Sequence, residues 1–109
     1  MNALTQPLAA IRDTDEQHFD ADVSSAPLVL VKFTGTWCPP CQAIQPVLEA
    51  LARVRKDLTV LEIDVDAHQA LAQRFGVRSI PTLIAFRDGK PFAQRVGSQS
   101  RAALDKMLT

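Results

Sequence analysis

The sequence contains two cysteines, Cys38 and Cys41, and the residues between them are Pro39 and Pro40. Two cysteines at this spacing can close a small disulfide ring, or open to two thiols, with little movement of the chain. Such a pair close to a strand–helix–strand pattern is typical of redox chemistry at sulfur. The spacing therefore predicts a dithiol that exchanges with disulfides. The two sulfurs would carry the electrons, so we expect no bound cofactor.

The flanking segments would place this pair at the start of a helix. An apolar run from Leu28 to Lys32 leads into the segment, and a long amphipathic helix pattern leads out of it. The first turn of a helix has unpaired N–H groups, and the helix dipole favours negative charge there. A thiolate at this place is stabilised, so we expect the pKa of its thiol to fall. Pro39 and Pro40 suit a first turn because no helical N–H is lost there.

The cysteine pair could instead be a structural disulfide or half of a zinc site. Two cysteines are too few to staple a small secreted domain, so a chemical role is the better interpretation. Structural zinc takes four ligands, and the only histidines are His18 and His68. Both histidines are interpreted as surface residues of helices. We therefore predict that the chain has no metal site.

Strand and helix patterns alternate along the chain. The expected strands are residues 8–12, 28–33, 58–65, 80–86 and 92–96. The expected helices are residues 14–23, a long helix after Cys38, a short helix capped by Asp66 and a last helix after Ser98. This order predicts an α/β fold, with a central mixed five-stranded sheet flanked by four helices on both faces. Residues 1–109 would form a single domain, with residues 1–7 as a loose lead-in.

Local signals define the ends and inner faces of these elements. Thr14 and Gln17 form a capping-box pattern for the first helix, and Gly76 is a stop signal for the third. Pro46 lies inside the long helix and is expected to kink it. Residues 87–90 carry the Asp-Gly signal of a hairpin. The helical residues expected to face the core are Phe19, Val23, Ile44, Val47, Leu48, Leu51, Val54, Ala67, Ala70, Leu71, Phe75, Leu104, Met107 and Leu108.

Length and charge exclude several functional classes. The 109 residues suit one domain, and 12 basic residues balance 12 acidic ones. This balance gives no electrostatic footprint for nucleic acid or an anionic membrane, and no apolar run is long enough to span a bilayer. The first residues show neither the charged nor the apolar region of a signal peptide. We therefore expect a cytoplasmic monomer that binds neither nucleic acid nor membranes.

These motifs together resemble the thioredoxin family, over most of the chain from about Ile11 to Leu108. The residues that carry the resemblance are Trp37-Cys38-Pro39-Pro40-Cys41, Pro46, Phe75-Gly76-Val77, Ile80-Pro81-Thr82, the hairpin from Phe86 to Gly89 and Val96-Gly97. A bare Cys-x-x-Cys is a weak signal. Its combination with a strand-to-helix turn and a later Ile-Pro-Thr is a specific one.

The resemblance implies a role for each residue of the site. Cys38 would be the exposed nucleophile, and Cys41, more buried, would resolve the mixed disulfide. Pro81 would have a cis peptide bond and lie against the cysteine pair. The backbone of Ile80 would pair with an extended substrate segment. The substrate-binding residues would be Trp37, Pro39, Pro40, Ile80, Pro81 and Gly97. Electrons would come from an outside enzyme similar to thioredoxin reductase.

Two departures from the family pattern lie close to the cysteines. Pro39 stands where the family has glycine, which stiffens the loop and removes an N–H that could point at the Cys38 thiolate. Loss of that donor should raise the thiol pKa, whereas rigidity could favour the closed disulfide. Thr34 stands where many members have tryptophan, which removes aromatic packing beside the site.

A third departure is a reversal of charge between two expected strands. Lys32 interrupts one apolar strand and Glu62 interrupts another, whereas the family usually has Asp and Lys, respectively, at these positions. A lone charge between buried strands is very costly, so we predict that the two residues form a pair behind Cys41. Glu62 could accept the proton of Cys41, or Lys32 could stabilise its thiolate. The pair could also be only a packing compromise.

The predicted function is that of a thiol–disulfide oxidoreductase that reduces protein disulfides through a Cys38/Cys41 cycle. Its substrates would be protein disulfides. One alternative is a dedicated reductant or oxidant for a particular partner. Another is a binding module that holds a partner on an apolar patch of Trp37, Ile80, Pro81 and Gly97, without electron transfer.

Overall fold

The computed structural model describes residues 11–109, and the expected lead-in and the start of the first expected strand lie outside this range. The strands are β1 (Ile11–Asp13), β2 (Leu28–Thr34), β3 (Leu58–Asp64), β4 (Thr82–Arg87) and β5 (Lys90–Val96). The helices are α1 (Phe19–Val23), α2 (Pro39–Val54), α3 (Gln69–Arg74) and α4 (Arg101–Met107). This element order is the one that the sequence predicts.

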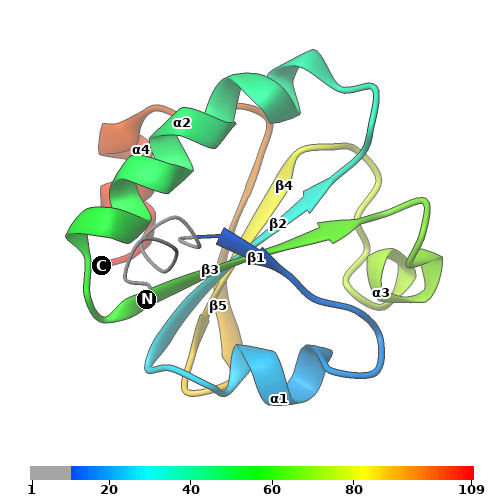
Figure 1. Ribbon diagram of the computed structural model, residues 1–109, viewed down its shortest axis with the longest axis horizontal. Helices are drawn as coiled ribbons and strands as arrows, with labels where there is room; N and C mark the ends of the chain where they lie inside the picture. Colours follow the sequence, from blue (N-terminus) through cyan, green and yellow to red (C-terminus); the bar gives the residue numbers. More distant parts are fainter. Residues whose placement is uncertain (1–10) are drawn as a thin grey trace, which may run out of the picture.

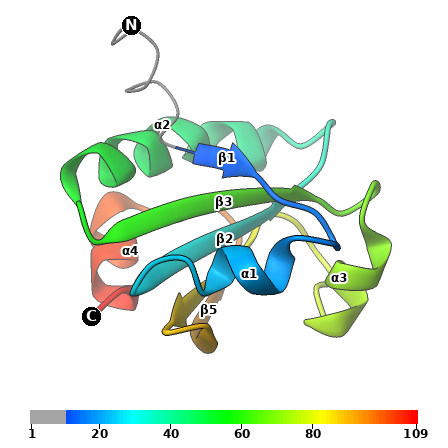
Figure 2. The same ribbon diagram turned by 60° about the horizontal axis from the view of Figure 1, so that its bottom comes forward.

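The five strands form one mixed sheet in the order β1-β3-β2-β4-β5. The first three are parallel to one another, whereas β4 runs antiparallel to β2 and to β5. Figure 1 shows α2 and α4 on one side of the sheet and α1 and α3 on the other. The turned view in Figure 2 shows β1 at the edge of the sheet, beside β3. The predicted fold class is therefore confirmed.

The central strand β2 supplies side chains to both faces of the sheet. Leu28 and Leu30 pack in the core that also contains α2 and α4 residues. Val29, Val31 and Phe33 pack in the core on the side of α1 and α3. Because side chains alternate along a strand, the next residue on the α2 face is Lys32. This strand therefore brings a charged residue into an otherwise apolar interior.

Helix α1 begins later than the sequence suggests. The Thr14 hydroxyl donates a hydrogen bond to the Asp22 carboxylate at 2.6 Å and caps no helix. The Asp15 carboxylate instead accepts a hydrogen bond from the backbone N–H of His18, and α1 starts at Phe19. The capping-box prediction at Thr14 is therefore wrong, since this hydroxyl is engaged by the far end of the helix.

The start of α3 also differs from its prediction. Asp64, the last residue of β3, accepts hydrogen bonds from the backbone N–H groups of Asp66 and Ala67. This interaction closes a turn before the helix, so Asp66 is not its cap, and α3 begins at Gln69. As a result Ala67 and Ala70 face solvent, contrary to the prediction. Leu71 is buried as predicted.

Most of the other local predictions are confirmed. Gly76 has φ +66° directly after α3, and the hairpin turn places Asp88 at φ 52° and Gly89 at φ 82°. Pro46 lies within α2, and the kink expected there stays a prediction. Val54, at the last turn of that helix, is 64% exposed, so its predicted core position is wrong. Across residues 11–109, none of the helices combines the length and apolar character needed to cross a membrane.

Candidate active site

The two cysteines form a disulfide at the start of α2, directly after the turn that follows β2. Their Cα atoms are 5.2 Å apart. Cys38 is the N-cap residue, with extended backbone, and its Sγ accepts a hydrogen bond from the Cys41 N–H at 3.2 Å. Pro39 and Pro40 occupy the first two helical positions, where no helical hydrogen bond is lost. The predicted strand-to-helix placement is confirmed.

Both sulfurs are covered in this oxidised state. Cys41 is 1% exposed and Cys38 is 5% exposed. Cys41 is the more buried residue, as predicted, but Cys38 is not the exposed residue that the family resemblance implies. Its sulfur is turned back over the first turn of α2, toward the Cys41 N–H. Access to Cys38 therefore depends on how a substrate approaches the closed ring.

The predicted substrate-binding residues differ in how exposed they are. Trp37 is 95% exposed, which excludes a place in the core, and Pro39 and Pro40 are also exposed. Ile80 is half-buried and Pro81 is buried. The predicted substrate-binding surface therefore has an exposed part, formed by Trp37, Pro39 and Pro40. Its more covered part, formed by Ile80 and Pro81, is called the floor below.

The floor lies close to the loop before the cysteines and is hydrogen-bonded to the residue that follows β5. The Ile80 side chain lies so close to Gly35 that a Cβ there would meet its Cδ1 at 2.8 Å. The Gly97 N–H donates a hydrogen bond to the Pro81 carbonyl at 2.8 Å. The Ile80–Pro81 peptide bond is cis, as predicted. Ile80, Pro81 and Gly97 therefore come together from two separate segments of the chain.

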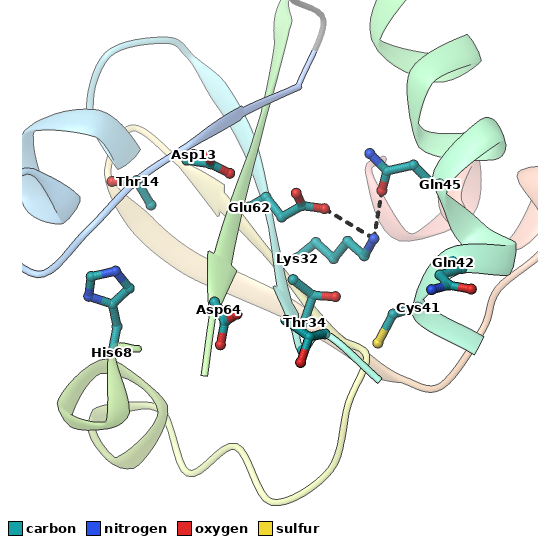
Figure 3. A pocket seen from close by; sticks show the side chains of 12 residues that line it. Asp13, Thr14, Lys32, Thr34, Cys41, Gln42, Gln45, Glu62, Asp64 and His68 are labelled. Carbon is teal, nitrogen blue, oxygen red and sulfur yellow. Dashed lines mark hydrogen bonds and ion pairs between the residues drawn. The ribbon is translucent and has the colours of Figure 1, made fainter. Parts of the chain in front are cut away.

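Lys32 and Glu62 are direct neighbours on β2 and β3, as predicted. The Lys32 Nζ lies 3.1 Å from the Glu62 carboxylate. The Lys32 side chain is 3% exposed and that of Glu62 is 23% exposed. A second acceptor, the Gln45 side-chain oxygen on α2, lies 2.6 Å from the same Nζ. In Figure 3 the ammonium group lies between Glu62 and Gln45. The buried charge is thus paired and hydrogen-bonded, as its environment requires.

This buried pair and Cys41 line one cavity of about 650 Å³. Figure 3 shows Cys41 and Gln45 projecting into it from α2 and His68 lying on the opposite side. The lining residues are Asp13, Thr14, Lys32, Thr34, Gly35, Thr36, Cys41, Gln42, Gln45, Glu62, Asp64 and His68. The prediction that the pair lies behind Cys41 is consistent with this arrangement. Charged side chains and the Cys41 sulfur therefore share one cavity.

Comparison with known proteins agrees with this geometry. The family model described as Thioredoxin matches residues 10–109. The chain belongs to the thioredoxin family. It is 46% identical to the thioredoxin of Mycobacterium tuberculosis over 102 residues, which cover 93% of this chain and 88% of that protein. The structure of a mutant thioredoxin from Halobacterium salinarum superposes with a TM-score of 0.85 at 39% identity, covering 90% of this chain and 87% of the other.

A further relative combines two activities in one name. The bifunctional thioredoxin reductase/thioredoxin of Mycobacterium leprae is 45% identical over 100 residues, which are 91% of this chain and 22% of that protein. The family and the Cys38–Cys41 disulfide together make this thioredoxin-family chain a thiol–disulfide oxidoreductase.

The two histidines of this thioredoxin-family chain lie in different environments. The His18 side chain is 64% exposed and contacts Asp15, as expected of a surface residue. His68 is 27% exposed, and its Nδ1 is buried without a hydrogen bond from the described residues, 3.8 Å from Glu16. His68 is therefore only partly at the surface, because the Asp64 turn brings it to the cavity. Within residues 11–109 no cluster of three or more His, Cys, Asp or Glu side chains could hold a metal ion.

Gln45 is the site residue that sequence reasoning missed. It is half-buried and follows Cys41 by four positions on α2, so the two side chains share one face of the helix. The neighbouring inner positions of that helix are apolar: Ile44, Leu48 and Leu51. A polar residue within an apolar stripe, opposite a strand lysine, is the signal that could have found it.

Proposed function

We propose that this oxidoreductase reduces protein disulfides through a cycle of its two cysteines. The Cys38 thiolate attacks one sulfur of a substrate disulfide and releases the other sulfur as a thiolate. Cys41 then attacks Cys38 in the mixed disulfide, releasing the second substrate thiolate and leaving the Cys38–Cys41 disulfide. Two electrons pass from the enzyme dithiol to the substrate. The observation that carries this proposal is the Cys38–Cys41 disulfide at the start of α2.

The positions of the two sulfurs support this division of roles. Cys38 lies at the N-cap of α2, where the helix dipole and the Cys41 N–H stabilise a thiolate. In the oxidised protein, the Cys41 N–H already donates to the Cys38 sulfur. Cys41 is the more covered of the two residues. A substrate therefore meets Cys38 first, and Cys41 reacts from within.

The recessed floor beside the cysteines would bind the substrate chain. No backbone hydrogen bond of Ile80 is found within residues 11–109, so its N–H and C=O are free to pair with an extended segment. Trp37, 95% exposed, would cover apolar side chains of that segment. Pro39, Pro40, Pro81 and Gly97 would complete the contact surface.

Lys32 and Glu62 would act on Cys41 in the second step. Glu62 is the more exposed member of the pair, and its carboxylate would accept the Cys41 proton through a water in the cavity that both residues line. Lys32 would then stabilise the thiolate that remains. The proton moves from sulfur to carboxylate, so the buried group of side chains keeps the same total charge. A pair that avoids any change in buried charge suits a reaction in a covered site.

The electron donor would be an enzyme of the thioredoxin reductase kind, and the site of action the cytoplasm. The name of the M. leprae relative supports the first point, because it joins a reductase and a thioredoxin in one chain. The bacterial thioredoxins among the relatives support the second. We further propose that the chain works as a monomer, without nucleic acid or membranes.

Reduction of insulin with dithiothreitol as electron donor tests the proposal. The wild-type protein should accelerate precipitation of the insulin B chain, and Cys38→Ser should remove the acceleration. A rate equal to that of the Cys38→Ser control would contradict disulfide reduction. The reduction potential then gives the direction of electron flow, since a value near about −270 mV marks a reductant and one near about −120 mV an oxidant.

A further inference from the structure

Gln45 joins the helix that carries Cys41 to the buried charge on the sheet. Its side-chain oxygen accepts a hydrogen bond from Lys32 at 2.6 Å, which is shorter than the 3.1 Å contact between Lys32 and Glu62. Lys32 belongs to β2, Glu62 to β3 and Gln45 to α2. The ammonium group is therefore held from two sides, by a carboxylate on the sheet and by an amide on the helix.

The amide links the ammonium to α2, the helix that begins next to Cys38 and contains Cys41. Cys41 and Gln45 are one helical turn apart, and both line the same cavity. Within residues 11–109 the side-chain acceptors of Lys32 are Gln45 and Glu62. Without Gln45, Glu62 alone would hold the ammonium, on the β3 side of the cavity. The distance of a cation from a thiolate matters more for buried groups, and both Lys32 and Cys41 are buried.

We propose that Gln45 is a positioning residue for the resolving step, acting through Lys32. It holds the ammonium on the α2 side of the cavity. Lys32 can then neutralise the Glu62 carboxylate before the step and the Cys41 thiolate after it. Before the step, Lys32 is paired with the Glu62 carboxylate. When the Cys41 proton moves to that carboxylate, the ammonium, still fixed by Gln45, faces the new thiolate.

This inference rests on the proposed roles of Lys32 and Glu62, and its test is independent of substrate turnover. In a Cys38→Ser background Cys41 is the only thiol of the chain. The ultraviolet absorbance of its thiolate, recorded against pH, then gives the midpoint of Cys41 ionisation without a reagent having to enter the site.

The test compares a set of variants made in that background. Gln45→Met removes the acceptor while keeping a side chain of similar length. Gln42→Met is the matched control, since Gln42 lines the same cavity from the same helix but has no side-chain hydrogen bond within residues 11–109. Lys32→Met and the Lys32→Met/Gln45→Met pair complete a double-mutant cycle. Gln45→Ala removes the same acceptor by truncation and repeats the central measurement.

We expect Gln45→Met and Gln45→Ala to move the Cys41 midpoint upward by about one pH unit, a tenfold loss of thiolate below the midpoint. Gln42→Met should leave it unchanged, and Gln45→Met should add no shift once Lys32 is replaced. An unchanged or lowered midpoint in both Gln45 variants would overturn the inference. An equal shift in the Lys32→Met background would overturn it too, because Gln45 would then act without Lys32.

The insulin assay separates this inference from the proposed function. A wild-type protein that is inactive toward insulin, but whose Cys41 midpoint depends on Gln45 through Lys32, would refute disulfide reduction and keep the positioning role. An active wild-type protein with a midpoint insensitive to Gln45 would refute only the positioning role.

Discussion

The two faces of the sheet have different interiors, although the same strands build both. On the side of α1 and α3 the interior is apolar along the strands, from Val29 through Val31 to Phe33. On the side of α2 and α4 it begins with Leu28 and Leu30 and then changes to Lys32. Strand β3 repeats the change, since Glu62 is the register partner of Lys32.

The charged layer formed by Lys32 and Glu62 lines the same cavity as Cys41. The two faces therefore differ most where the sheet meets the cysteines. Aromatic rings fill the face of α1 and α3: neighbouring rings among Phe19, Phe33, Phe75 and Phe86 have centroids 5.3 to 6.0 Å apart. The other face contains a buried ion pair beside Cys41. Buried ion pairs are weak stabilisers compared with apolar packing. A charged layer is therefore better explained by chemistry at Cys41 than by stability.

Truncation of the apolar face should give the largest loss of stability. Phe19 is fully buried and packs against Phe75 and Phe86. We expect Phe19→Ala to lower the free energy of unfolding by about 3–5 kcal/mol, as measured by urea denaturation. Insulin reduction per folded molecule should be unchanged, because this face does not reach the cysteines.

The control for this prediction is an exposed phenylalanine of β5. Phe92 is 41% exposed, with the Arg87 guanidinium 4.6 Å from its ring centroid. Phe92→Ala should cost about 1 kcal/mol or less. Equal losses in Phe19→Ala and Phe92→Ala would show that the aromatic face is not the stabilising one.

Removal of one member of the ion pair should give the next largest loss. Glu62→Leu leaves the Lys32 ammonium buried with Gln45 as its only side-chain acceptor within residues 11–109. Breaking a fully buried pair costs about 3–5 kcal/mol. We expect a somewhat smaller loss, since Glu62 is 23% exposed. Denaturation by urea at neutral pH measures it.

Replacement of both members separates stability from chemistry. The Lys32→Leu/Glu62→Leu protein should be as stable as wild type, or more stable by about 1–4 kcal/mol, because apolar packing replaces a desolvated pair. Its turnover of insulin should nevertheless fall by about 100-fold, the lower range for loss of general acid–base catalysis. Full activity in this stable protein would mean that the pair is a packing compromise, and the contrast between the faces would lose its functional meaning.

The sequence was sufficient for the fold because its periodic signals are local and mutually consistent. The apolar run of β2 and the stripe along α2 each indicate one element, and the hairpin at Asp88 and Gly89 fixes the antiparallel part of the sheet. The Lys32–Glu62 pair could also be predicted, since a charge inside an apolar strand demands a partner. The strand register, in which Lys32 lies opposite Glu62, confirms that argument.

The remaining features depend on which of several nearby hydrogen-bond partners a side chain takes. The hydroxyl of Thr14 pairs with Asp22 instead of capping a helix, and the turn at Asp64 moves His68 to the cavity. Cys38 is covered because its sulfur folds back toward the Cys41 N–H. Such local hydrogen bonds compete with helix capping, and the residue pattern alone does not show which of them forms.

The apolar face also has a cation, Arg74. Its environment differs from that of the buried Lys32. The Arg74 guanidinium lies 5.6 Å from the Phe19 ring centroid and 5.0 Å from that of Phe75. Its partner is the exposed carboxylate of Asp20, at 2.8 Å. Both charged groups remain in water, so this face gains a stacking contact without burying a charge. An exposed pair of this kind should contribute little to stability.

The smallest predicted effect is the pH dependence of this exposed pair. The hydrogen bond from Arg74 lowers the pKa of Asp20 from its ordinary value of 3.8. Because the folded state binds this proton less readily than the unfolded state, the stabilisation is complete above the unfolded pKa and is lost as the pH falls through the folded one. Asp20→Asn should thus be slightly less stable than wild type at about pH 7, with the difference shrinking below about pH 4. Urea denaturation of both proteins across this range measures it, with Asp105→Asn, in the exposed pair with Arg101, as a control for surface charge. A difference that is large, or that is constant with pH, would show that Arg74 and Asp20 form more than a solvated pair, and that the two faces handle charge in the same way.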